Sequence, residues 1–305
     1  MIYRRTHLAE LGLHLEQIQL QDGTLVTCIP DLGPVQWLHD QLLRSPTDPT
    51  LRNANDRAPS GMLNLSFNIY LIQSSAGTTL VDTGIGNNKT RSDRPAWHQL
   101  QGPFLEILRQ LGISAIDVDL VINTHLHADH VGWNTIADGN DGWQPTFGAA
   151  TYVTSCAELE ALRARVEQSD NPETLLHGAW ADSIRPIVEG PGYRTVKAGD
   201  IVSGLEFIAL PGHTPGMLGL LFEVGEDRIV FSADAIHHPV QLGLGTGASK
   251  FCADPARSIA TRVALLERCV GERLVMAPYH FPAPAFGYIS QATTGFELVP
   301  LDLCF

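Results

Sequence analysis

Short apolar runs bounded by turn-forming residues recur along most of the chain. Phe67 to Gln73 and Thr78 to Asp82 are rich in strand-forming residues, and the four residues between them, Ser74 to Gly77, are typical of a hairpin turn. From Pro103 to Leu111 the apolar positions recur at helical spacing and a glycine follows, which predicts a helix. Further strands are expected at Val118 to Thr124, Ala150 to Thr154, Ile201 to Leu210, Met217 to Val224, Ile229 to Ala233 and Leu274 to Pro278.

Two longer helices are expected between these strands. The first covers Ser155 to Gln168, because Ser155 can cap it and Glu158 lies three residues further on, as in a capping box. The second covers Pro255 to Val270. Strands and helices alternate without a repeat of fixed length, which favours a layered α/β fold over a solenoid.

The first 60 residues contain the polar, proline-containing stretch Ser45 to Ser60, which is typical of a loop. We therefore expect residues 1–60 to be an N-terminal arm packed on the core and residues 61–305 to be the folded core, with a single domain overall. A length of 305 residues bounds the number of domains only softly. Hydrophobic residues at 44% and charged residues at 17% are ordinary for a globular protein, so a disordered or fibrous chain is not expected.

The net charge and the composition of individual segments restrict the expected binding partners and cellular location. The net charge of −13 opposes nucleic-acid binding, which draws on Lys and Arg to neutralise phosphates. Met1 to Leu20 has no continuous apolar stretch of the kind found in signal peptides, and no segment approaches the ~20 apolar residues that span a bilayer. Five widely spaced cysteines without a CxxC pair are typical of reduced thiols, so a cytoplasmic protein without a membrane segment is expected.

A dense group of metal-ligating residue types follows the predicted strand Val118 to Thr124. His125, His127, Asp129 and His130 lie within six residues of one another. Consecutive side chains leave a strand end in different directions, so such a loop can place several ligands around a small volume. Imidazole nitrogen and carboxylate oxygen are ligands that Zn²⁺ takes, and this run therefore predicts a metal site.

Three more candidate ligands stand at predicted strand ends. His213 lies in the turn Pro211 to Gly216, after the strand that ends at Leu210. Asp234 and His280 each follow another predicted strand. Sites in layered α/β folds assemble at the ends of strands, so residues far apart in the sequence can meet there.

The order and spacing of these motifs resemble those of a known protein superfamily. The segment Leu80 to Gly84, the run His125 to His130, His213 within PGHTPG, Asp234 and His280 together resemble the metallo-β-lactamase superfamily. The resemblance covers about residues 67–280 and is greatest to the acyl-homoserine lactonase and methyl parathion hydrolase-like branches. It implies an α/β fold, the αβ/βα four-layer sandwich of two mixed sheets flanked by helices, with residues 61–305 as the hydrolase domain.

The resemblance also implies a binuclear metal centre. One metal would be held by His125, His127 and His213, and a second by Asp129, His130 and His280. Asp234 would bridge them. Two Zn²⁺ per chain are expected, although Mn, Fe or Co can occupy nitrogen and oxygen ligands according to availability.

Hydrolysis of a small-molecule ester or lactone is the reaction implied, by attack of a bridging hydroxide on the carbonyl carbon, with phosphotriesters as additional substrates. Asp129 is a ligand that can also pass a proton to the leaving alkoxide. His237, three residues after Asp234, is the second catalytic candidate, as an acid or an orienting group.

Residues around the ligand loops could either support or pack against the site or take a direct part in it. Asp82 in the LVDTG segment is expected to hold its loop against the ligand loop rather than to bind metal. For Cys252 and His238, packing is favoured over a place in the pocket. Five aromatic residues near the ligand loops fit either a pocket wall or a core, namely Trp133, Trp143, Phe147, Phe281 and Phe286.

Other functions remain open alternatives. A glyoxalase II-like thioesterase shares the ligand set, although the sequence offers no obvious Lys and Arg cluster for glutathione carboxylates. A non-catalytic metal-binding protein of the same fold would normally lack ligands, and none is missing here. The first 60 residues could also serve as a homodimerisation arm.

Overall fold

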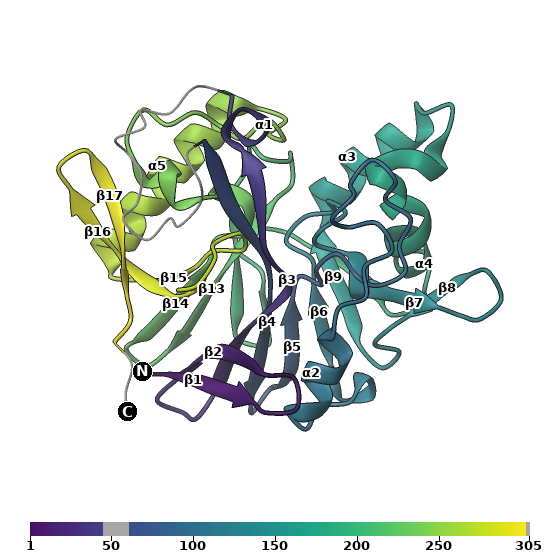
Figure 1. Ribbon diagram of the computed structural model, residues 1–305, viewed down its shortest axis with the longest axis horizontal. Coiled ribbons are helices and arrows are strands. Elements are labelled where there is room, and N and C mark those ends of the chain that lie inside the picture. Colours follow the sequence, from purple (N-terminus) through teal and green to yellow (C-terminus); the bar gives the residue numbers. More distant parts are fainter. Residues whose placement is uncertain (45–60, 303–305) are drawn as a thin grey trace.

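The structure, a computed structural model, describes residues 1–44 and 61–302. Two β-sheets pack face to face and helices cover their outer faces (Figure 1). Within the described residues the larger sheet has eight strands in the order β1-β2-β3-β4-β5-β6-β9-β10, and the second has seven in the order β11-β12-β13-β14-β15-β16-β17.

The strand bounds are as follows. The larger sheet contains β1 Ile2–Leu8, β2 Leu13–Gln19, β3 Leu25–Leu38, β4 Met62–Ser74, β5 Gly77–Val81, β6 Leu120–Ile122, β9 Thr151–Ser155 and β10 Tyr193–Val196. The second sheet contains β11 Ile201–Val202, β12 Leu205–Ala209, β13 Leu218–Val224, β14 Asp227–Phe231, β15 Val275–Ala277, β16 Gly287–Ala292 and β17 Gly295–Pro300. A separate ribbon pairs β7 Thr135–Ala137 with β8 Trp143–Pro145.

Alternation of side chains along each strand produces the layers. In β6, Leu120 and Ile122 face the core between the two sheets, whereas Val121 faces outward, where α2 Phe104–Gln110 packs. In β14, Ile229 and Phe231 face the same central core and Val230 faces outward toward α5 Pro255–Glu272. Successive side chains of a strand point to opposite faces, so both sheets bury both faces. The predicted four-layer αβ/βα sandwich is confirmed.

Most predicted elements between residues 67 and 280 are present. The hairpin β4–β5, the helix α2 and the strands β6, β9, β13, β14 and β15 lie where the apolar runs place them. The helix α3 Cys156–Glu167 begins after Ser155, whose side chain accepts a hydrogen bond from the Glu158 N–H. The remaining helical segments are α1 His39–Leu42, η2 Ala115–Asp117, η3 Gly132–Asn134, η4 Pro172–Gly178, η5 Trp180–Ile184, α4 Arg185–Val188, η6 Ala233–Ala235 and η7 Pro239–Leu242.

Two expectations differ from the structure. Residues 1–44 are not an arm, because β1, β2 and β3 are strands of the larger sheet and β3 pairs with β4 over much of its length. The strand expected at Ile201 to Leu210 is two strands, because Ser203 and Gly204 adopt φ values of 51° and 80° that turn the chain into the β11–β12 hairpin. The loop expected at Ser45 to Ser60 lies outside the described residues.

Two further observations concern membrane segments and cysteines. In the described part of the chain, no helix is both long and apolar enough to cross a membrane. The four cysteines at described positions, Cys28, Cys156, Cys252 and Cys269, are free thiols.

Candidate metal centre

The candidate ligands lie on loops that follow strands of both sheets. The loop from His125 to His130 follows β6 of the larger sheet. His213 follows β12 and His280 follows β15 in the second sheet, and Asp234 lies in the 3₁₀ turn η6 after β14. The sandwich thus brings ligands of both sheets to one edge, as expected from their positions at strand ends.

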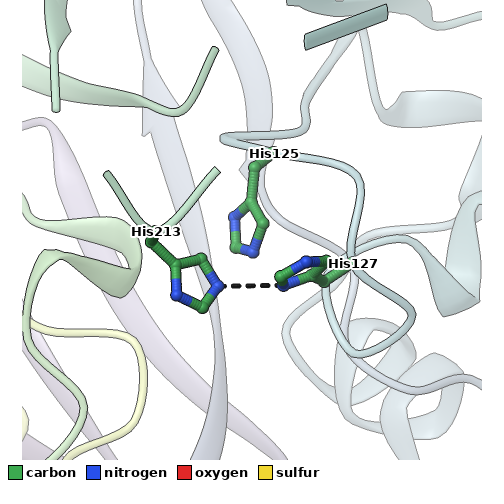
Figure 2. A group of neighbouring side chains, drawn as sticks. All are labelled: His125, His127 and His213. Carbon is green, nitrogen blue, oxygen red and sulfur yellow. Dashed lines mark hydrogen bonds between the residues drawn. The ribbon is translucent and has the colours of Figure 1, made fainter. Parts of the chain in front are cut away.

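Three of the histidines form one group. His125, His127 and His213 place their nearest ring nitrogens within 4.8 Å of one another. Figure 2 shows the three rings converging from two chain segments, with His125 and His127 on one and His213 on the other. The His213 Nε2 and His127 Nδ1 atoms are 2.9 Å apart. We call these residues the three-imidazole group.

A second group contains a carboxylate. Ligand atoms of Asp129, His130 and His280 also lie within 4.8 Å of one another. Asp129 Oδ2 is 3.6 Å from His280 Nε2 and 3.9 Å from His130 Nε2. We call these residues the carboxylate group.

Asp234 lies between the two groups. Its Oδ2 atom is 3.2 Å from His213 Nε2 and 3.2 Å from His280 Nε2, and its Oδ1 atom is 3.2 Å from His130 Nε2. His237 approaches the same carboxylate, with Nε2 at 3.3 Å from Oδ2. The carboxylate therefore contacts members of both groups, which is the position expected of a bridging ligand.

Hydrogen bonds behind several rings direct the other ring nitrogen toward the centre. The Nδ1 atom of His130 is 2.9 Å from Asp82 Oδ2, and the Nδ1 atom of His280 is 3.0 Å from the Ser66 carbonyl oxygen. The Nδ1 atom of His125 is 3.2 Å from Thr124 Oγ1. Contacts of this kind fix the orientation of a metal-ligating imidazole.

Asp82 has the supporting position expected from the sequence. Besides contacting the His130 ring, its carboxylate accepts hydrogen bonds from the Thr124 N–H at 2.8 Å and from the Thr124 hydroxyl. It therefore joins the loop after β5 to the start of the ligand loop.

Several atoms at the centre have no hydrogen-bond partner among the described residues. They are buried and comprise His125 Nε2, His130 Nε2, Asp234 Oδ1 and both ring nitrogens of His237. Unpaired buried polar atoms are costly, whereas nitrogen and oxygen atoms converging on one point suit divalent cations. The residues present therefore fit a metal centre.

The protonation states also fit metal binding. Burial lowers the pKa of His125 and His213 well below the usual value and lowers the pKa of His127 to about 4. Neutral imidazole is the form that binds metal, so the three-imidazole group is ready to ligate. The surrounding histidines hold the pKa of Asp234 well below its usual value, although burial alone would raise it.

The histidines of the carboxylate group are shifted in the opposite direction. Burial lowers the pKa of His130, but the carboxylates of Asp234, Asp82 and Asp129 outweigh burial and raise the pKa well above its usual value. The pKa of His280 is raised in the same way, against the effect of burial, by Asp234 and Asp129. Protons on these rings would balance buried negative charge, and cations bound here would replace them.

A cavity opens directly onto this centre. His127, Asp129, His213, Asp234, His237 and His280 line it, so both catalytic candidates, Asp129 and His237, border the cavity. Its other walls are mostly apolar and comprise Trp37, Leu65, Phe67, Arg94, Trp97, Ala128, Leu176, His177 and Phe251.

Four of the five aromatic residues for which both a pocket wall and a core were open are core residues, and Trp143 is half-buried outside the core. Trp133 and Phe147 pack with α2 on the outer face of the larger sheet, Phe286 lies between the sheets and Phe281 packs with α5. Trp143 lies under the Lys89 ammonium, with Nζ 3.4 Å from the ring centre. Cys252 packs against His213, with Sγ 3.6 Å from Nδ1, and is not among the wall residues.

The family follows from the sequence match together with this geometry. A family model described as the metallo-beta-lactamase superfamily matches residues 65–265, more than half of the chain. The chain belongs to the metallo-beta-lactamase superfamily.

Curated proteins of this superfamily match part of the chain. An N-acyl homoserine lactonase of Bacillus cereus is 26% identical over 187 residues, which cover 56% of this chain and 64% of that protein. A probable metallo-hydrolase of Mycobacterium tuberculosis (strain ATCC 25618 / H37Rv) is 27% identical over 189 residues, which cover 56% of each chain. The chain thus spans less than two thirds of the length of these relatives.

Solved structures match over nearly the whole chain. AbOPH, a hydrolase of the beta lactamase superfamily, superposes with a TM-score of 0.77 at 22% identity and covers 95% of this chain and 98% of its own. AidC, a dizinc quorum-quenching lactonase in complex with its product, gives a TM-score of 0.77 at 20% identity with the same coverage. At these identities the match concerns the fold.

Some residues at this metallo-beta-lactamase centre carry little sequence signal. Tyr279 stacks on the His130 ring, with centroids 3.8 Å apart, and its hydroxyl donates to the Asp129 carbonyl oxygen. Only its place beside His280 could have drawn attention to it. The wall residues Arg94 and Trp97 come from a loop and His177 from η4, and none of these segments has a periodic apolar pattern, so the sequence did not predict their place in the cavity.

Proposed function

We propose that this protein is a binuclear metal-dependent hydrolase that cleaves a carboxylic ester or lactone. The observation that carries the proposal is the convergence of the three-imidazole group, Asp234 and the carboxylate group at the end of a largely apolar cavity. A ligand set that opens onto a cavity suits catalysis better than a closed structural site.

The two groups would each hold one ion. His125, His127 and His213 would bind the first, Asp129, His130 and His280 the second, and Asp234 both. Zinc is the expected metal, because its preferred ligands are the imidazoles and carboxylates found here. When bound, such ions polarise a carbonyl oxygen and lower the pKa of a coordinated water.

The chain's own groups would orient the substrate and move protons. Asp129 and His237 both border the cavity beside Asp234, so either can hand a proton to the leaving alkoxide of an ester or ring-opened lactone. The aromatic walls Trp37, Phe67 and Trp97 would bind an apolar acyl portion and exclude water from it.

Names of relatives support the same substrate class. The Bacillus cereus relative is an N-acyl homoserine lactonase, and one similar solved structure holds the product N-hexanoyl-L-homoserine at its catalytic metal center. An apolar chain attached to a lactone ring suits the walls described above. Phosphotriesters are the second class of substrate expected, since a pair of metal ions also accommodates a phosphoryl centre.

A glyoxalase II-like thioesterase is less well supported. Glutathione carries two carboxylates, whereas Arg94 is the only Lys or Arg among the described residues that line this cavity. A cytoplasmic location and a homodimer stay predictions, and light scattering of the purified protein measures the oligomeric state directly.

A substrate panel on the metal-loaded protein tests the function. We expect cleavage of N-acyl lactones and aryl esters with wild-type protein and a loss of about 100-fold or more with His127→Ala, because a ligand beside the reacting atoms is removed. His14→Ala is the matched control, since His14 is an exposed histidine in β2, outside the ligand groups.

Two results would contradict the proposal. Opening of a cephem ring with no cleavage of lactones or esters would place the protein in another branch. Cleavage of a glutathione thioester in preference to lactones and esters would favour the thioesterase.

A further inference from the structure

A buried carboxylate lies beside the loops that carry the three-imidazole group. Glu158, in the first turn of α3, is only 6% exposed. Its Oε1 atom accepts a hydrogen bond from the Leu126 N–H at 3.3 Å. Its Oε2 atom accepts hydrogen bonds from the Thr214 hydroxyl at 2.7 Å and from the Gly216 N–H at 3.1 Å.

The spacing of Ser155 and Glu158 predicts a capping box, in which the Glu side chain returns to the N-cap backbone. Only half of that arrangement is present. The Ser155 hydroxyl accepts from the Glu158 N–H, but the Glu158 carboxylate turns away to the two loops. The Glu158 carboxylate therefore does not cap α3 but binds the two loops.

Both loops carry members of the three-imidazole group. Leu126 stands between His125 and His127, and Thr214 directly follows His213. The first loop leaves the larger sheet and the second leaves the second sheet, so one carboxylate joins ligand loops of both halves of the sandwich.

Close packing supports this link. A Cβ atom added at Gly216 would lie 2.1 Å from the Glu158 backbone nitrogen, so the second loop lies directly against the start of α3. Any side chain at Gly216 would push the loop away from the carboxylate. The approach of helix and loop is thus part of the same arrangement.

We propose that Glu158 is a positioning residue that sets the distance of His213 from His125 and His127 and so prepares the first metal site. The Glu158 carboxylate accepts three hydrogen bonds, from two backbone N–H groups and one hydroxyl, and an ionised carboxylate can only accept. Metal ligands gain affinity when their supporting contacts hold them in place before binding. The proposal rests on metal binding by the three-imidazole group and extends the proposed function to the residue that arranges it.

Glu158→Gln tests the assignment with almost no change of shape. The amide keeps one accepting oxygen but turns an NH₂ group toward donors, so at least one link between the loops is lost. We expect affinity at the three-imidazole site to fall about 10-fold to 100-fold, with the second site unchanged. Zinc titration against a chelator measures both affinities, and the absorption spectrum of the Co²⁺-loaded protein reports the ligand geometry.

Glu160→Gln is the matched control, because Glu160 is an exposed residue of the same helix. Thr214→Val provides a second, milder variant that removes one of the three donors and leaves the charge of Glu158 in place. It is expected to lower the same affinity by less than Glu158→Gln, and it decides the matter if Glu158→Gln does not fold.

Wild-type affinity and Co²⁺ spectrum in both Glu158→Gln and Thr214→Val would overturn the proposal. Equal weakening of both metal sites would also overturn it, since that would indicate a general loss of structure. The readout is metal binding, so a wild-type protein that cleaves neither lactones nor esters would refute the proposed function and leave this test intact.

Discussion

The two halves of the candidate metal centre differ in charge and in support. The three-imidazole group has neutral rings, and its loops are joined through their backbone and the Thr214 hydroxyl by Glu158. In the carboxylate group the pKa of His130 and of His280 is raised by the neighbouring carboxylates, and Asp82 and the Ser66 carbonyl contact the two rings directly. Carboxylate support thus reaches the three-imidazole group through its loops, whereas in the carboxylate group it reaches the His130 ring directly.

This difference has a consequence for metal binding. A metal ion would enter the three-imidazole group without displacing protons, because burial lowers the pKa of these imidazoles and favours their neutral form. Ions entering the carboxylate group must displace protons, but they also meet more negative charge. The two sites are therefore expected to respond differently to acid and to substitution of their supports.

Acid should separate the two halves most strongly. Because the pKa of His130 and of His280 is raised, protons should compete with metal for both rings at a pH where His127, with a pKa of about 4, stays neutral. Dialysis against zinc at about pH 8 should give two metal equivalents, and at about pH 5.5 close to one. Elemental analysis measures the ratio. Simultaneous loss of both equivalents would show that the halves do not differ.

Substitution of Asp82 should affect one half more than the other. Asp82→Asn removes the charge that the His130 ring contacts, so affinity at the carboxylate group should fall about 10-fold to 100-fold while the three-imidazole site changes less. Chelator competition measures both steps. Asp22→Asn, at an exposed residue of the β2–β3 turn, serves as a control. Weakening confined to the three-imidazole site would contradict the assignment of the two groups.

The smallest effect is expected behind His213. Its Nδ1 atom contacts the Cys252 thiol at 3.6 Å, a weaker partner than the carboxylate behind His130. Cys252→Ala should therefore lower affinity at the three-imidazole site by less than about 10-fold. A larger loss, measured by the same zinc titration, would mean that the thiol rather than the Glu158 link holds this half together.

The metal-binding edge could be predicted from the sequence because its signal is local. His125, His127, Asp129 and His130 lie within one run of six residues, and the other candidate ligands lie in the turns that follow apolar strands. Asp82 could be placed behind them because its motif lies at a strand end as well. The strands themselves show clear apolar runs, since the sandwich buries both of their faces.

The first three strands could not be predicted in the same way. In β1 only Tyr3 and Leu8 are buried, and the rest of the strand is mostly polar and largely exposed at the sheet edge. Its pairing with β2 comes from backbone hydrogen bonds that no side-chain pattern records. The result is a weak signal for a regular part of the fold.

The contacts of the Glu158 side chain could not be predicted from the sequence either. Its spacing from Ser155 fits a capping box, and only the tertiary contact with Leu126 and Thr214 redirects it. Cavity walls such as Arg94 and His177 depend on how loops approach one another across the fold, which local patterns do not encode.

The candidate ligands and most of the cavity walls come from different segments of the chain, so the walls can change without changing the ligands. Most of the walls, including Trp37, Trp97, Leu176 and Phe251, come from segments that contribute no candidate ligand. Changes there can alter which molecules fit while the ligand loops stay as they are. A lineage carrying this scaffold can therefore exchange substrates through mutations in the walls, without rebuilding the chemistry at the edge of the sandwich.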